Sequence, residues 1–97
     1  MTDGLYKALA DPTRRTILDE LTEQSGQTLF EIVTRLTMKH GSSMSRQAVS
    51  QHLAVLESAG LVTTRREGRY KFHDLDTAPL RQIVERWPVP DTPEDES

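Results

Sequence analysis

The spacing of hydrophobic positions predicts a chain built mainly from short amphipathic helices. Apolar residues recur at i, i+3, i+4 and i+7 along residues 29–36 and again along residues 80–87, which is the period of a helix with one buried side. Residues 4–10, 12–24 and 45–59 carry shorter versions of this stripe, bounded by residue types that start or stop helices. The pattern therefore predicts a mainly α-helical protein.

Capping side chains support three of these helix starts. Asp11 stands where a side chain can accept a hydrogen bond from a free backbone N–H, and Ser45 does the same before the fourth helix. Thr28 and Glu31 have the spacing of a capping box. The third helix is expected to end near residue 38, and the polar stretch 39–44 predicts a loop longer than a tight helix-turn-helix needs.

A β-hairpin is predicted between the last two helices. Residues 61–66 and 69–75 have the composition of strands, and residues 67–68 between them end in glycine, as short hairpin loops often do. With that loop, Arg66 pairs with Arg69. The order of elements is then that of a winged helix-turn-helix with one additional helix at each end.

The alternation of side chains along the strands predicts two different faces for this hairpin. We expect the face toward the core to carry Leu61, Tyr70 and Phe72. The opposite, outer face then carries Arg66, Arg69 and Lys71. Like charges on neighbouring strands repel each other unless an anion lies against them, so this face favours contact with phosphate or with a DNA minor groove.

The helix over residues 45–59 has a polar side that suits contact with DNA bases. Its apolar side is formed by Val49, Leu53 and Leu56, and its polar side carries Arg46, Gln47, Ser50 and Gln51. Arginine can bind guanine, and glutamine adenine, through two hydrogen bonds each in the major groove. His52 lies at the edge of the apolar side and is interpreted as a packed residue or a phosphate contact rather than a metal ligand.

The net charge of −3 conceals a basic region. Residues 39–73 hold six lysines and arginines against two glutamates, a net charge of +4. Residues 88–97 hold four acids, three prolines and no bases, a composition that predicts a disordered tail. Because local charge decides where phosphate is attracted, an acidic total is compatible with DNA binding. We predict one DNA-binding and dimerisation domain over residues 1–87.

Composition excludes several other classes of protein. The chain has 97 residues and no cysteine, so disulfides, thiolate metal sites and cysteine nucleophiles are excluded. No apolar run approaches the roughly 20 residues of a membrane span, and no signal peptide is recognisable, so a cytoplasmic protein is expected. No catalytic triad, paired acidic cleft or phosphate-binding loop stands out, so we expect neither an enzyme nor a cofactor.

Three segments together resemble the ArsR-type, arsenical-repressor-like family of winged-helix transcription factors. They are residues 9–18 (LADPTRRTIL), residues 50–62 (SQHLAVLESAGLV) and residues 65–70 (RREGRY). The resemblance implies a homodimeric repressor that binds operator DNA and responds to a signal, with an unidentified small-molecule effector left open. It also implies that the operator is an inverted repeat.

The resemblance assigns roles to individual residues. It matches Arg46, Gln47, Ser50 and Gln51 to the base-reading positions, and Arg66 and Arg69 to the wing. Together with Ser45, His52 and Lys71, which the helix and hairpin patterns add, these are the predicted DNA contacts. The first and last helices match the family's dimer interface, with apolar contacts expected from Leu5, Tyr6, Leu9, Leu80, Ile83, Val84 and Trp87.

The chain departs from the family's metal sensors. Where thiolate sensors have cysteines, residues 29–33 read LFEIV, and His40, His52 and His73 lack the spacing of a metal site. No metal is therefore expected. Two alternatives remain at this point: a winged helix used for protein–protein contact, and a metal-responsive repressor with a non-thiolate site.

Overall fold

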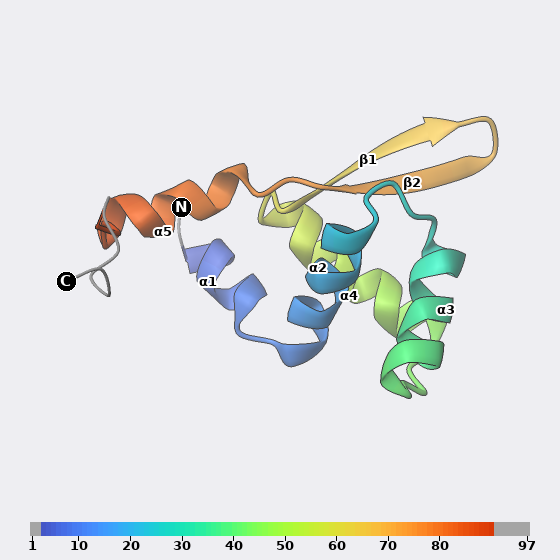
Figure 1. Ribbon diagram of the computed structural model, residues 1–97. Helices are drawn as coiled ribbons and strands as arrows, with labels where there is room; N and C mark the ends of the chain where they lie inside the picture. Colours follow the sequence, from blue (N-terminus) through green and yellow to red (C-terminus); the bar gives the residue numbers. More distant parts are fainter. Residues whose placement is uncertain (1–2, 91–97) are drawn as a thin grey trace.

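The computed structural model describes residues 3–90. Within that range five α-helices, one short 3-10 helix and one two-stranded antiparallel sheet follow one another (Figure 1). They are α1 (Asp3–Leu9), α2 (Pro12–Glu23), α3 (Leu29–His40), α4 (Arg46–Ser58), β1 (Val62–Glu67), β2 (Tyr70–Leu75), η1 (Ala78–Leu80) and α5 (Arg81–Arg86). The predicted fold class, a winged helix-turn-helix with an added helix at each end, is confirmed.

The predicted caps form as the sequence indicates. Oδ2 of Asp11 accepts a hydrogen bond from the backbone N–H of Arg14 at 3.0 Å. Thr28 and Glu31 form the full capping box at the start of α3. The hydroxyl of Ser45 accepts from a backbone N–H in the first turn of α4 at 3.1 Å. Each cap satisfies a backbone donor that the helix leaves free, so these three boundaries are fixed locally.

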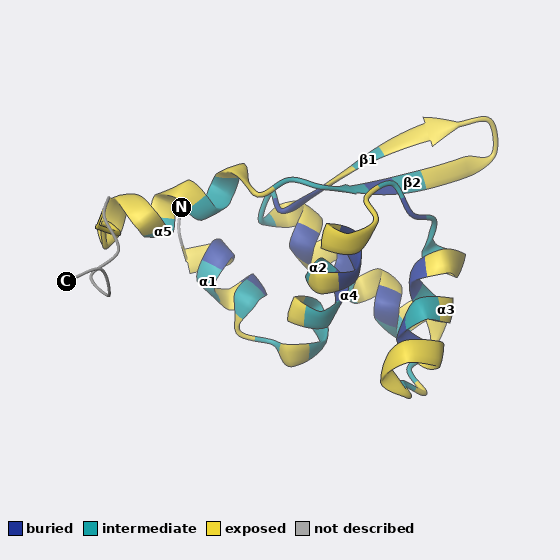
Figure 2. Cartoon of the chain, viewed as in Figure 1, coloured by how far each residue is buried: buried dark blue, intermediate teal, exposed yellow. Residues whose placement is uncertain are grey.

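The core lies between α2, α3, α4 and the base of the hairpin, and α1 closes one side (Figure 2). Its buried apolar side chains come from every one of these elements: Leu5, Ala8, Ile17, Leu21, Ile32, Leu36, Val49, Leu53, Leu56, Leu61 and Val62. Figure 2 shows α5 and the hairpin tip as exposed, and they lie at opposite ends of the folded structure of the described residues. The two ends are therefore free to meet partners.

The loop predicted over residues 39–44 is shorter in the structure. α3 continues to His40, and Gly41 ends it in the left-handed conformation with φ of +65°. Lys39 and His40 stay helical, although they break the apolar stripe, because both side chains bind the carboxylate of Glu20 on α2. This tertiary contact extends the helix beyond the end of its hydrophobic pattern.

The register of the hairpin differs from the predicted one. Glu67 pairs with Tyr70, and Arg66 pairs with Lys71 rather than with Arg69. The turn therefore consists of Gly68 and Arg69, with Gly68 at φ of +64°. Placing the glycine first suits this turn, because Gly68 takes a conformation that other residues adopt only at a cost.

The predicted orientation of the hairpin was also wrong for Tyr70 and Phe72, although Leu61 is buried as expected. Val62 and His73 are buried, so their face packs on the core, and that face also carries Arg66 and Lys71. Tyr70 lies on the other face and is 58% exposed. The reason is anchoring at the base of β2: the backbones of His73 and Gln27 exchange two hydrogen bonds of 2.8 and 3.1 Å, and Nδ1 of His73 donates to the Gln27 carbonyl at 2.9 Å.

Candidate nucleic-acid interface

α4 presents its polar side to solvent. Arg46, Gln47, Ser50 and Gln51 are all exposed, whereas Val49, Leu53 and Leu56 on the opposite side are buried. The amphipathic pattern that predicted this arrangement is the usual consequence of a helix with one side on a core. Four side chains with hydrogen-bonding groups therefore project from one free helix surface.

We call β1, β2 and their turn the wing. Because Lys71 shares the core-facing side of the wing, it points toward the helices rather than away from them. A hollow of about 430 Å³ separates the wing from α3 and α4. It is lined by Thr28, Leu29, Phe30, Arg46, Ser50, Arg69, Tyr70, Lys71 and His73. The structure thus brings together two predicted contact residues from α4 and two from the wing.

The three cations around this hollow carry unneutralised charge. Within residues 3–90 no carboxylate lies within 4.0 Å of Arg46, Arg69 or Lys71. Arg65, by contrast, is paired with Asp74 at 2.9 Å and with Glu67 at 2.6 Å.

Those contacts, chiefly the hydrogen bond to Asp74, raise the pKa of the Arg65 guanidinium above its ordinary value. The wing thus uses one arginine to hold its strands and leaves its other cations available.

The remaining predicted contact residues occupy different places. Gln47, Gln51 and Arg66 are exposed but do not line the hollow. Ser45 is exposed, and its hydroxyl is engaged in the helix cap. His52 is half-buried, and its Nδ1 lies 3.2 Å from Nη1 of Arg14 and 3.8 Å from Oδ2 of Asp11. The predicted set therefore divides into a convergent group at the hollow and a remaining group, of which Arg66 lies on β1 and the others lie on α4 or at its N-cap.

Arg14 holds α4 against the first two helices, a role that the sequence did not reveal. Its guanidinium donates to the carbonyls of Lys7 and Ala8 at 3.0 and 2.9 Å as well as contacting His52. Its backbone N–H is the main reason that the pKa of Asp11 lies below its ordinary value. One residue thus ties the end of α1, the start of α2 and the middle of α4 together.

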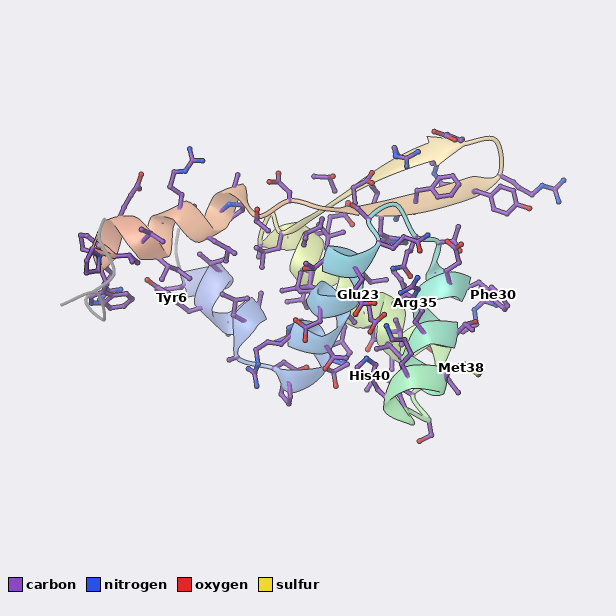
Figure 3. The ribbon with its side chains drawn as sticks, in the orientation of Figure 1. Tyr6, Glu23, Phe30, Arg35, Met38 and His40 are labelled. Carbon is purple, nitrogen blue, oxygen red and sulfur yellow. The ribbon has the colours of Figure 1, made fainter. Side chains whose placement is uncertain are left out.

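An ion-pair cluster fixes α3 against α2. The Glu20 carboxylate, only 2% exposed, accepts hydrogen bonds from Arg35 and Lys39, each at 3.0 Å, and from His40 at 2.8 Å. Figure 3 shows Glu23, Arg35 and His40 in the space between the two helices. Burial would raise the pKa of Glu20, but these three hydrogen bonds outweigh it and lower the pKa to about 2. The carboxylate is therefore ionised at neutral pH.

The predicted dimer surface lies where α1 and α5 meet. The rings of Tyr6 and Trp87 lie 6.2 Å apart, and the guanidinium of Arg86 lies 4.4 Å from the Trp87 ring centroid. Trp87 is 57% exposed and Val84 45% exposed. These side chains form an exposed, partly aromatic surface on the single protomer.

One residue of the predicted dimer surface is placed differently. Leu5 is 2% exposed and packs into the protomer's own core, so its side chain has no surface left for a partner. Leu9, Leu80 and Ile83 are half-buried at the edge of that core. In α1, Leu5 faces the core and Tyr6 faces outward. The helix is too short for its apolar pattern to predict this orientation.

Within residues 3–90, no group of three or more His, Cys, Asp or Glu side chains has the arrangement needed to hold a metal ion. None of the helices described here has the length and apolarity required to cross a bilayer.

Comparison with known proteins identifies the class. A family model described as a helix-turn-helix domain matches residues 9–65. The chain is 47% identical over 85 residues to YuzN of Bacillus subtilis, an uncharacterised HTH-type transcriptional regulator, and the match covers 88% of this chain and 92% of the relative.

Two solved structures share the fold. An ArsR-like transcriptional regulator from a Rhodococcus species has a TM-score of 0.75 at 30% identity, over 88% of this chain and 72% of that one. The homodimeric winged helix-turn-helix DNA-binding domain of Mb0332 from Mycobacterium bovis, described as a possible ArsR-family regulator, has a TM-score of 0.67 at 27% identity, over 96% and 85% of the two chains.

A helix-turn-helix followed by a basic hairpin defines a winged helix-turn-helix protein. This chain belongs to the ArsR family of winged helix-turn-helix transcriptional regulators. The resemblance seen in its sequence is confirmed.

Proposed function

We propose that the protein is a homodimeric transcriptional repressor that binds an inverted-repeat operator through α4 and the wing. One observation carries this proposal. Arg46 and Ser50 of α4 border the same hollow as Arg69 and Lys71 of the wing, and the three cations have no carboxylate partner within residues 3–90. Groups suited to bases and groups suited to phosphate thus face the same side of the molecule.

Each part of this surface has its own task. Arg46, Gln47, Ser50 and Gln51 enter the major groove and read base edges. Arg66, Arg69 and Lys71 bind backbone phosphate, which supplies most of the affinity and its salt dependence. Ser45, at the N-cap of α4, and His52 on α4 flank the base-reading group. Arg69 stands at the wing turn, where it reaches the backbone or the minor groove beside α4.

The exposed surface of α1 and α5 supports a dimer. An apolar patch with two aromatic rings on so small a domain is typical of a protein–protein contact. In the proposed dimer Tyr6, Leu9, Leu80, Ile83, Val84 and Trp87 contribute to the interface. Two copies of α4 then enter successive major grooves, roughly 34–36 Å apart. A dimer on an operator that overlaps a promoter excludes polymerase, which is the basis of repression.

Fluorescence anisotropy with DNA from upstream of the protein's own gene tests the proposal. We expect salt-sensitive binding. The R46A variant should lose about 1–3 kcal/mol of binding free energy through one base position, and it should then tolerate other bases at that position. R81A is the matched control, because Arg81 is exposed on α5 and no carboxylate pairs with it within residues 3–90.

Two results would count against the proposal in different ways. Absence of binding to that DNA at low salt would overturn it. If R46A weakened binding equally at all sequences, Arg46 would be a phosphate contact and the base-reading role would pass to the remaining α4 residues.

A further inference from the structure

The hollow between α3, α4 and the wing has apolar and aromatic lining, which the binding of backbone phosphate alone does not require. Its volume of about 430 Å³ lies within the range of small-molecule sites, roughly 300–1,000 Å³. Leu29 and Phe30 supply apolar and aromatic surface, whereas a phosphodiester needs only charge and hydrogen-bond donors. The hollow therefore suits a ligand with both an apolar body and a negative charge.

The charge around the hollow is of one sign. Arg46, Arg69 and Lys71 line it, and no acidic residue does. The cations come from two separate elements, so they surround the space rather than forming a stripe along one surface. An anionic group placed there would be attracted from two sides, and a cationic group would be repelled.

The aromatic part of the hollow is available to a ligand. Phe30 is 67% exposed, and Figure 3 shows it directed away from α2 on the outer side of α3. An exposed ring of this size gains free energy when its surface is covered. A flat aromatic ligand would stack on or beside this ring while its charged group meets the cations.

We infer that this hollow is the binding site of a small aromatic anion, such as an aromatic carboxylate, and that an occupied site releases DNA. The second half rests on the proposed function, because the ligand would occupy Arg46, Ser50 and Arg69 of the proposed DNA surface. Direct competition of this kind needs no conformational signal from a distant site. It gives the regulator a means of responding to a metabolite.

Naphthoate is a suitable probe, with naphthylmethanol as the neutral compound of the same shape. Binding is measured first without DNA, by calorimetry and by amide chemical shifts of the isotope-labelled full chain. We expect one naphthoate per protomer, shifts centred on Phe30, Ser50 and Tyr70, and affinity for naphthylmethanol lower by about tenfold or more, because the three cations act only on the charged probe.

Two substitutions locate the site. F30A is expected to lower naphthoate affinity about tenfold, because it removes one ring of the site. M38A is the matched control: Met38 is 79% exposed on the same helix but does not line the hollow, so its affinity should not change. Both side chains are exposed, so both variants should fold, which circular dichroism checks. Equal effects of the two substitutions, or equal affinities for the two probes, would show non-specific adsorption and overturn the inference.

The regulatory half is tested by displacement. At constant ionic strength, naphthoate should release labelled operator DNA, and equimolar acetate should not. If naphthoate binds at the hollow but DNA stays bound, the competitive mechanism is wrong. If the protein binds naphthoate as expected but never binds DNA, the proposed function fails and the ligand site stands.

Discussion

Nη1 of Arg14 on α2 lies 3.2 Å from Nδ1 of His52 on α4. A guanidinium can only donate, so Nδ1 of His52 accepts this hydrogen bond. The two residues are 38 positions apart in the chain. Their contact connects the elements beside the proposed dimer surface to the helix that carries the proposed base contacts.

Replacement of Arg14 by alanine should destabilise the protein. R14A removes the hydrogen bonds to Lys7, Ala8 and His52 together, and we expect the free energy of unfolding to fall by about 2 kcal/mol. Urea denaturation measures this. R15A is the control: Arg15 is exposed and donates one side-chain hydrogen bond, to the Leu9 carbonyl at 2.7 Å, so its loss should stay below about 1 kcal/mol. Equal losses in the two variants would contradict the role given to Arg14.

Glu20 should make the protein sensitive to acid. Its pKa is lowered from 4.5 to about 2 in the folded state, so the carboxylate contributes stability that is complete above about pH 5 and is lost as the pH falls toward 2. We expect E20Q to cost on the order of 3 kcal/mol at pH 7 and to flatten the dependence of the free energy of unfolding on pH in that window.

The control for Glu20 lies one turn further along α2. Glu23 is 60% exposed and pairs with Lys39 at 2.7 Å, so E23Q should cost below about 1 kcal/mol and leave the acid sensitivity in place. Urea denaturation at a series of pH values compares the two. An E20Q protein that keeps the full acid sensitivity would show that another carboxylate is responsible.

Two glycines with left-handed backbones should respond differently to alanine. Gly41 has φ of +65° and open space around the position of a Cβ, whereas at Gly60, with φ of +80°, a Cβ would lie 3.3 Å from Cγ of Pro79. We expect G41A to cost about 1 kcal/mol from backbone strain alone and G60A about 2 kcal/mol, because η1 must also shift. Thermal unfolding monitored by circular dichroism ranks the two variants; the reverse order would contradict the packing of η1 on the end of α4.

Trp87 should hold the dimer together if α1 and α5 form its interface. W87A removes the largest exposed side chain of that surface, and we expect the free energy of dimerisation to fall by about 2 kcal/mol. Sedimentation equilibrium measures the dissociation constant. M38A, which removes an exposed apolar side chain from α3, should leave the dissociation constant unchanged. Loss of the dimer in M38A but not in W87A would move the interface to α3.

The predicted acidic tail over residues 88–97 lies for the most part outside the described residues, since residues 91–97 fall beyond them. Pro88, Val89 and Pro90 are exposed. The two-part division of the chain stays a prediction.

Local signals determined three helix starts and the side that α4 turns to solvent. Asp11, Thr28 and Ser45 act within one turn of their own position, so their roles can be read from a few neighbouring residues. The exposed side of α4 follows in the same way, because three buried residues at helical spacing fix the orientation of every other side chain on that helix. This is why the exposed polar side of α4 was predictable from the sequence.

The tertiary structure decided what depends on contacts between distant residues. An alternating strand has two faces, and only the anchoring of His73 to Gln27 chose the one that turns Lys71 toward α4. Glu20 extended α3, and Arg14 engaged His52, through contacts 20 and 38 positions apart. The sequence by itself therefore determined the elements and the polar surface of α4. Tertiary packing created the hollow that the wing and α4 enclose, because packing joins residues that share no local pattern.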